Sequence, residues 1–83
     1  MAMRQPTVED RVKEIVAKVF HRNVDMLNRN THFVEDLKVN PFTLNELIAD
    51  LEVEFGMDIP KEEVRRSNTI GETVDSIENW LSK

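Results

Sequence analysis

The chain of 83 residues has no cysteine, which excludes disulfides and thiolate metal sites. It also lacks an apolar run long enough to span a membrane, and its first seven residues lack the apolar core of a secretion signal. We therefore expect no membrane contact. A cytoplasmic location is expected as well, because a chain without disulfides suits a reducing compartment.

Positive charge is scarce. Eleven Lys and Arg face sixteen Asp and Glu, a formal net charge of -5 that argues against a nucleic-acid partner. The acids concentrate in residues 41–64, where seven of them face the single base Lys61, a local balance of -6. Residues 1–30 instead carry six bases and four acids. We expect the acidic part of the chain to favour a protein partner with a basic surface.

Apolar residues recur every three or four positions in three segments, which predicts amphipathic helices. The first begins at a cap formed by Thr7 and Asp10 and runs through Phe20. The second begins at Asn40 and Pro41 and ends at Gly56. The apolar stripes of the first and second segments are Val8, Val12, Ile15, Val16, Val19 and Phe20, then Phe42, Leu44, Leu47, Ile48, Leu51 and Phe55.

A third, short helix is expected over residues 60–64 and a final one after a capping box of Thr69 and Glu72. The final helix places Trp80 on its apolar stripe, as a core anchor. The long connection of residues 21–40 has scattered apolar residues that we expect to pin it to the core, namely Val24, Met26, Leu27, Phe33 and Leu37. The sequence thus predicts one all-α domain over residues 1–83, a small four-helix bundle with three longer helices, one short helix and a long first loop.

No residue pattern indicates catalysis or metal binding. The chain has no cysteine nucleophile, no carboxylate pair that stands out as acid and base, and no recognisable triad. His21 and His32 are eleven residues apart, with no second pair of ligands. We predict that the protein is not an enzyme and has no metal site, and we expect a monomer.

Three segments carry a family resemblance. Residues 33–47 read FVEDLKVNPFTLNEL, residues 51–60 read LEVEFGMDIP and residues 69–77 read TIGETVDSI. Together they resemble the acyl carrier protein family over about residues 8–81. The resemblance implies an acyl-carrier-like bundle, a 4'-phosphopantetheine arm on a serine, and enzymes of fatty-acid, polyketide or related acyl metabolism as partners.

The resemblance breaks at the place where the arm is attached. The family's serine position falls on Pro41, its preceding aspartate on Asn40 and its glycine on Lys38. Proline has neither a hydroxyl nor a backbone N–H, so Pro41 is not competent to accept the arm, and we predict no cofactor. Thr43 is a poor substitute, because two residues along a helix rotate a side chain by about 200°. The other hydroxyls considered lie outside the matching motif, at Thr31, Ser67, Ser76 and Ser82.

The resemblance also implies that partners dock on the second helix. The family's apolar docking positions fall on Phe42, Asn45 and Ala49, and its acidic ones on Asn40, Thr43, Glu46, Glu52 and Val53. The predicted partner-binding residues are Phe42, Asn45, Glu46, Ala49, Glu52 and Val53. Phe42 could pack in the core, but we favour an exposed anchor. The acids of this helix could form a docking surface or an ordinary solvated face.

Three functions remain open from the sequence. The leading hypothesis is an acyl-carrier-like domain that lacks the phosphopantetheine-accepting serine and acts through protein–protein contacts beside acyl-metabolism enzymes. The second is a genuine acyl carrier modified at an unexpected residue. The third is a structural subunit of a larger complex, whose acidic helix fills a basic groove.

Overall fold

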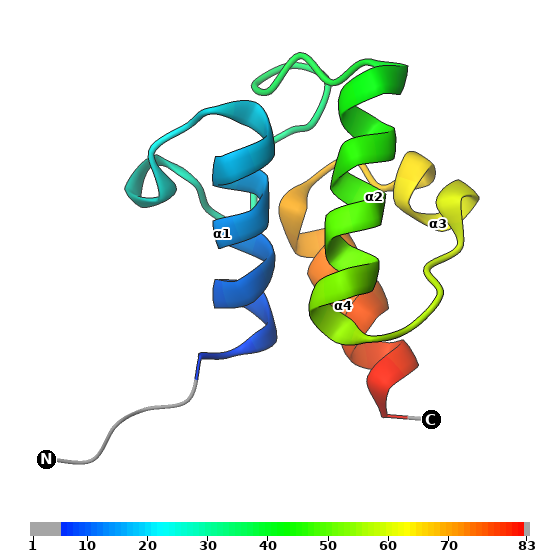
Figure 1. Ribbon diagram of the computed structural model, residues 1–83. Helices are drawn as coiled ribbons and strands as arrows, with labels where there is room; N and C mark the ends of the chain where they lie inside the picture. The colour runs from blue at the N-terminus through cyan, green and yellow to red at the C-terminus, as the bar shows by residue number, and fades with distance from the viewer. Residues whose placement is uncertain (1–5, 83) are drawn as a thin grey trace, which may run out of the picture.

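A computed structural model describes residues 6–82, which fold into a small helical bundle (Figure 1). The elements are α1 (Val8–Phe20), the 3-10 turn η1 (Val24–Met26), α2 (Pro41–Phe55), α3 (Lys61–Arg66) and α4 (Ile70–Leu81). Residues 6–82 contain no strand, only an isolated bridge between His32 and Thr69. The predicted all-α bundle of three longer helices and one short helix is confirmed.

Side-chain caps fix where the long helices begin. The Thr7 hydroxyl accepts a hydrogen bond from the Asp10 N–H at 3.1 Å, and the Asp10 carboxylate accepts one from the Thr7 N–H at 3.2 Å. This reciprocal pair satisfies two donors that a helix start leaves without partners. At the far end of α2, Gly56 adopts the left-handed conformation with φ 61°, as its position predicted.

The core forms where α1 packs against both α2 and α4. The short helix α3 packs mainly against α2. Each long helix contributes apolar residues with almost no exposed surface, because the three- and four-residue spacing turns them to one side. These fully buried residues are Val12, Val16, Leu47, Leu51, Ile70, Val74 and Ile77. Trp80 is partly buried against this core, in keeping with its predicted role as an anchor.

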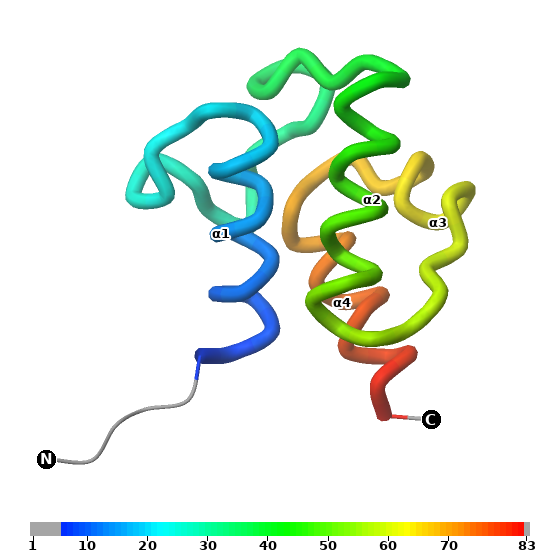
Figure 2. Tube along the Cα trace, in the orientation of Figure 1, coloured from blue at the N-terminus to red at the C-terminus, as the bar shows by residue number. Residues whose placement is uncertain are grey.

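The long connection of residues 21–40 crosses one end of the bundle between α1 and α2 (Figure 2). Leu27, Phe33 and Leu37 are buried and hold it to the core, as predicted. The prediction for Met26 is wrong, because its side chain is 76% exposed. Met26 lies at the end of the η1 turn, and the next residue, Leu27, takes the core position instead.

The same connection also completes the start of α4. The backbone N–H groups of Ile70 and Gly71 donate to the carbonyls of Thr31 and Arg29, at 3.1 and 2.9 Å. These donors belong to the first turn of α4 and have no partner within the helix. The loop therefore supplies hydrogen bonds that the helix start needs.

Arg29 ties three parts of the bundle together. Its guanidinium donates to Asp75 of α4 at 2.7 Å and to Glu9 of α1 at 3.2 Å. A longer contact of 3.4 Å reaches the carbonyl of Gly71. Hydrogen bonding to Asp75, and then to Glu9, raises the pKa of Arg29 above its ordinary value. One side chain thus holds the loop over the seam between α1 and α4.

Two details of the last helices differ from the prediction. The short helix covers Lys61–Arg66 rather than residues 60–64, because Pro60 is extended and serves as the N-cap. The Thr69 hydroxyl accepts from the Glu72 N–H as predicted, but the Glu72 carboxylate accepts from the N–H of Asn68 rather than from that of Thr69. The prediction of a reciprocal capping box is therefore wrong by one residue, because the carboxylate binds the N–H before that of the N-cap. The N-cap residue Thr69 is extended there and pairs with His32.

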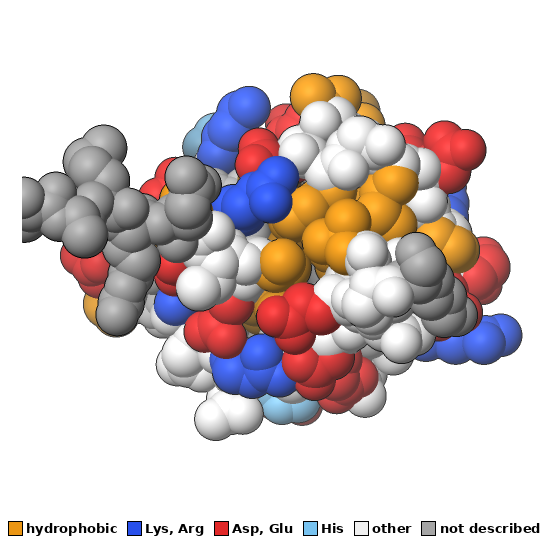
Figure 3. Space-filling model, turned by 90° about the horizontal axis from the view of Figure 1, so that it is seen from below, with side chains coloured by type: hydrophobic (Ala, Val, Ile, Leu, Met, Phe, Trp, Pro, Cys, Tyr) orange, Lys and Arg blue, Asp and Glu red, His pale blue; other side chains and the backbone are white. Residues whose placement is uncertain are grey.

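The beginning of α1 and the end of α4 lie at the same end of the bundle, and the start of α2 lies at the opposite end (Figure 1). Viewed from the end where the described chain starts and stops, hydrophobic side chains gather near the centre, with basic side chains beside them on the upper left and acidic side chains below (Figure 3).

Gly71→Ala should destabilise the bundle. A Cβ atom at this position would lie 3.0 Å from both the Cβ and the carbonyl oxygen of Arg29, and that oxygen is held by the Gly71 N–H. We expect the free energy of unfolding to fall by about 1–3 kcal/mol, measured by urea unfolding. Asn79→Ala, at an exposed position of the same helix, should change it by less than about 0.5 kcal/mol. Equal stability of the two variants would contradict the close packing of loop and helix.

Candidate functional site

The start of α2 is held by a reciprocal cap. The side-chain oxygen of Asn40 accepts from the Thr43 N–H, and the Thr43 hydroxyl accepts from the Asn40 N–H, both at 2.9 Å. Pro41 follows as the first helical residue, where its missing N–H costs nothing and its fixed φ suits the helix. Pro41 is exposed at the end of the bundle.

Lys38 takes an unusual backbone conformation just before this cap. Its φ is 55°, in the left-handed region that glycine adopts easily and side chains with a Cβ adopt at a cost. Within residues 6–82, His21 is the one other residue besides glycine with positive φ. The turn that leads into α2 therefore has the geometry of a glycine position occupied by lysine.

The hydroxyl groups near Pro41 are engaged or distant. The Thr43 hydroxyl also donates to the Asn40 carbonyl at 3.1 Å, so it is fully used by the cap. Thr31 is buried, and its hydroxyl accepts from the Asn28 N–H. Ser67 and Ser82 are the C-caps of α3 and α4, and their hydroxyls donate to the carbonyls of Glu63 and Asn79 in those helices. None of these four presents a free hydroxyl beside the start of α2.

A cavity of about 250 Å³ opens between α2, α3 and the end of the long loop. Its lining includes buried core residues and reaches the first turn of α2. The apolar side chains that line the cavity on the core side are Phe33, Val39, Leu44, Leu47 and Val64. Pro41 also lines it. The position of Pro41 and an apolar interior space are therefore adjacent.

The predicted partner-binding residues share one side of α2. At 100° per residue, Phe42, Glu46, Ala49 and Val53 fall within an arc of about 60°. Phe42 is 79% exposed and Val53 is 84% exposed, which supports the exposed alternative for Phe42 over core packing. Asn45 and Ala49 are also exposed. We call Phe42, Glu46, Ala49 and Val53 the α2 stripe.

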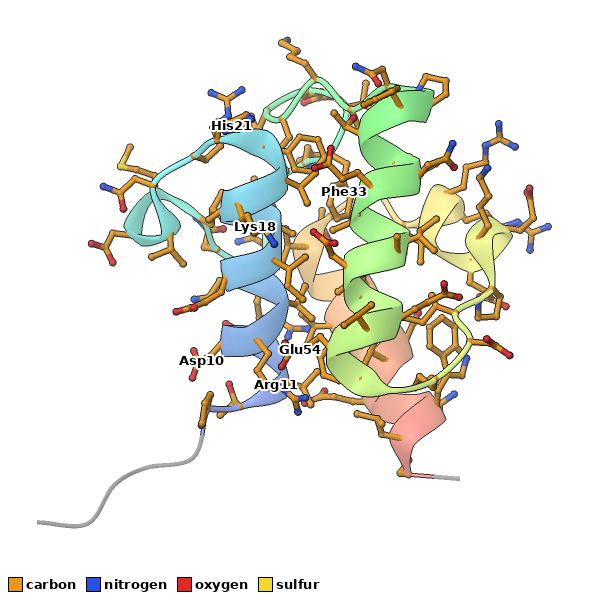
Figure 4. All side chains as sticks on the ribbon, in the orientation of Figure 1. Asp10, Arg11, Lys18, His21, Phe33 and Glu54 are labelled. Atoms are coloured by element: carbon orange, nitrogen blue, oxygen red, sulfur yellow. The ribbon has the colours of Figure 1, made fainter. Side chains whose placement is uncertain are left out.

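Most acids of α2 are engaged within the molecule rather than presented by the stripe. Glu54 pairs with Arg11 of α1 at 2.7 Å, and the two side chains point toward one another (Figure 4). Asp50 lies 3.8 Å from the ammonium of Lys18. The Glu52 carboxylate accepts from the N–H of Ile59 at 2.9 Å. Three of the acids that suggested a docking surface therefore contribute to the fold.

Among the predicted partner-binding residues, Glu52 is the least suited to bind a partner, because its carboxylate already accepts a hydrogen bond from the Ile59 N–H. Glu46 keeps an exposed side chain on the stripe, and no ion pair of Glu46 occurs among residues 6–82. The sequence could not separate these cases, because the partners of Asp50 and Glu54 come from α1, more than thirty residues away. The stripe that results is apolar at both ends with one acid between them.

The chain is similar to known proteins along most of its length. A family model described as a phosphopantetheine attachment site matches residues 10–77. Acyl carrier proteins of Lactobacillus acidophilus and Buchnera aphidicola are each 32% identical to the chain, over 77 and 76 residues. These matches cover 93% and 92% of this chain and 96% of each relative. The chain belongs to the acyl carrier protein family.

A solved structure of a candidate acyl carrier protein from Mycobacterium tuberculosis shares the fold, with a TM-score of 0.79 and 23% sequence identity. The alignment covers 89% of this chain and 99% of that one. Acyl carrier proteins are carriers rather than enzymes, they normally bear 4'-phosphopantetheine, and they interact with enzymes of acyl metabolism. The prediction that the protein is not an enzyme is therefore confirmed through its family.

Residues 6–82 hold no group of three or more His, Cys, Asp or Glu side chains placed to bind a metal ion. None of the helices in this part of the chain is both long and apolar enough to cross a membrane. The start of α2, the neighbouring cavity and the α2 stripe are the features from which a function must be built.

Lys38→Gly should stabilise this family member, because glycine relieves the strain of the left-handed turn. We expect a gain of about 0.5–1 kcal/mol in the free energy of unfolding, read from urea unfolding curves. Lys18→Gly removes the same side chain from the last turn of α1, where the backbone is helical, and should instead cost up to about 1 kcal/mol. A loss of stability in both variants would show that the Lys38 side chain contributes more than its backbone strain costs.

Proposed function

We propose that this protein is an acyl carrier family member without a phosphopantetheine arm, and that it acts by binding other proteins. The observation that carries the proposal is the residue at the first position of α2. Pro41 is exposed there but offers no oxygen to which a phosphodiester could be bonded. The Thr43 hydroxyl nearby is occupied by the helix cap.

The register of the family motif supports the placement of the lost serine at Pro41. In that register the family's glycine falls on Lys38, and Lys38 has the left-handed φ of 55° that a glycine would take without strain. A shift of one residue in either direction would put the glycine on a residue whose φ is negative. The strained lysine therefore supports a register in which the family's glycine falls on Lys38 and its serine on Pro41.

The α2 stripe is the surface that we propose for the partner. Phe42 and Val53 are large apolar side chains that a monomer of this size leaves in water at both ends of one helix face. Glu46 between them is positioned to meet a basic residue. We propose enzymes of acyl metabolism as partners, with a contact that is mostly apolar and carries one charge pair, and a monomeric, cytoplasmic protein.

Co-expression with a phosphopantetheinyl transferase of broad specificity tests whether an arm is attached. We expect the intact mass of the wild-type chain to stay that of the unmodified polypeptide. Pro41→Ser restores a hydroxyl at the first position of α2, and we expect this variant to gain the mass of one phosphopantetheine. Pro41→Ala is the matched control, since it removes the ring without adding an oxygen and should remain unmodified.

An arm on the wild-type chain would overturn the proposal in favour of a genuine carrier, and peptide mapping would then locate the modified residue. Failure of Pro41→Ser to react, with helicity and unfolding free energy unchanged, would show that other departures such as Lys38 and Asn40 also block the transferase.

Affinity capture followed by mass spectrometry tests the α2 stripe. Proteins retained by the wild type should be lost with Phe42→Ala and Val53→Ala, because each removes an apolar contact worth on the order of 1–2 kcal/mol. Glu46→Gln should reduce retention less, by an amount that shrinks as salt rises. Glu14→Gln, an exposed acid on α1, is the control. Retention that depends on Glu46 alone and vanishes in salt would favour electrostatic docking instead.

A further inference from the structure

The surface where α2 meets α3 is positively charged, although it lies in the most acidic stretch of the chain. The short helix α3 packs against α2 on the side away from α1 (Figure 1). Two cations, Lys61 and Arg65, line the opening between the two helices, and no acid lines it. Both residues are exposed. The charge at this place is therefore opposite in sign to that of residues 41–64 as a whole.

Helical geometry separates the charges of α3. Arg65 is rotated by only about 40° from Lys61 around the helix axis, so the two cations share one face. Glu62 and Glu63 are rotated by about 100° and 200° from Lys61 and lie outside the lining of the opening. The two acids of this helix thus point away from the place where its two cations gather.

Acids of the neighbouring segments do not reach the opening either. Glu46 is rotated by about 140° from Pro41 around α2, and only Pro41 lines the opening. In the long loop, Val34 lines the opening and the next residue, Glu35, does not. The acidic composition of this part of the chain is therefore no guide to the charge of this surface.

Neither cation is held by a strong contact within the molecule. No ion pair of Lys61 occurs among residues 6–82. Arg65 contacts Glu62 at 3.3 Å, but both side chains are exposed, and such pairs contribute little to stability. Lys61 is also the first residue of α3, where the helix dipole favours an acid over a base. The fold does not account for these two charges, and both are available to a partner.

Exposed apolar side chains lie beside the two cations. Val34 is 68% exposed, and Pro41 is exposed as well. Both line the same opening as Lys61 and Arg65. We call these four residues the α3 face. It is distinct from the α2 stripe, because Phe42 of the stripe is rotated by about 100° from Pro41 and does not line the opening.

We propose that the α3 face binds an acidic amphipathic helix of another protein. Lys61 and Arg65 are four residues apart, and two carboxylates four residues apart on a partner helix have the same spacing. An apolar side chain of the partner between these carboxylates covers Val34 and Pro41 and removes them from water. The inference goes beyond the proposed function, whose α2 stripe meets a basic residue at Glu46.

The same charges fit an anionic membrane less well than a protein. A membrane surface extends over the whole side of the molecule, so it also meets the exposed acids Glu35, Glu62 and Glu63 and the net charge of -5. A single helix covers two cations and leaves those acids in water. The small extent of the positive surface therefore favours a narrow partner.

Fluorescence anisotropy of a labelled synthetic peptide tests the proposal on the full, unmodified chain. The peptide has about 18 residues, enough to form a helix, with Leu and Glu at spacings of three and four residues. We expect saturable binding with a dissociation constant below about 1 mM, weakened as salt rises. A second peptide with Gln in place of every Glu should bind about tenfold more weakly, because it loses two charge pairs.

Four variants locate the site. Lys61→Gln should weaken binding of the acidic peptide about three- to fivefold, and Arg66→Gln, which removes a charge of the same helix outside the opening, should leave it unchanged. Val34→Ser should weaken binding about threefold through loss of an apolar contact. Met26→Ser, at another exposed apolar residue of the long loop, is its control.

The results separate this proposal from its rivals. Absence of saturable binding of the acidic peptide to the folded wild type would overturn it. Equal binding of the Gln peptide, or equal weakening by Lys61→Gln and Arg66→Gln, would reject charge recognition at the α3 face. Binding to phosphatidylglycerol vesicles that depends on Lys61 to the same degree would replace the partner helix with a membrane surface. Modification of the wild-type chain by the transferase would overturn the armless function alone, because peptide binding is measured on unmodified protein.

Discussion

The entry of the chain into α2 is the constraint on which the rest of the site depends. A left-handed residue at Lys38 reverses the direction of the loop, Asn40 caps the helix, and Pro41 starts it. Once this start is fixed, the helical repeat determines which side chains of α2 enter the core and which face water. Leu47 and Leu51 turn inward, and Phe42 and Val53 turn outward, as a consequence of the same few backbone angles.

Two acidic side chains of α2 pair with basic side chains of α1. A net charge of -5 suggests an anionic surface, yet Arg11 and Lys18 of α1 neutralise Glu54 and Asp50 across the α1–α2 contact. Arg11 also lies 4.3 Å over the ring of Phe55, which adds a cation–π contact to the same seam. Two of the acids of α2 thus help to join helices, and the α2 stripe is left with Glu46 as its single acid.

The fold was largely predictable from the sequence because its signals are local. Spacing of apolar residues and the caps at Thr7, Asn40 and Gly56 act within a few residues, and these gave the helix positions closely. The errors arose where distant segments decide the outcome. The exposure of Met26 depends on which residue of a turn reaches the core, and the partner of the Glu72 carboxylate depends on the extended pairing of Thr69 with His32. The cavity beside Pro41 depends on the packing of α3 on α2, which no local pattern specifies.

The placement of the described chain ends has a consequence for how the protein can be joined to something else. Residues 6 and 82 leave from the pole opposite the start of α2. A fluorescent protein, a solid support or a neighbouring module fused at either side would therefore sit behind the bundle and leave Pro41 pointing outward. Attachment at these points would leave the start of α2, at the opposite end of the bundle, accessible to other molecules.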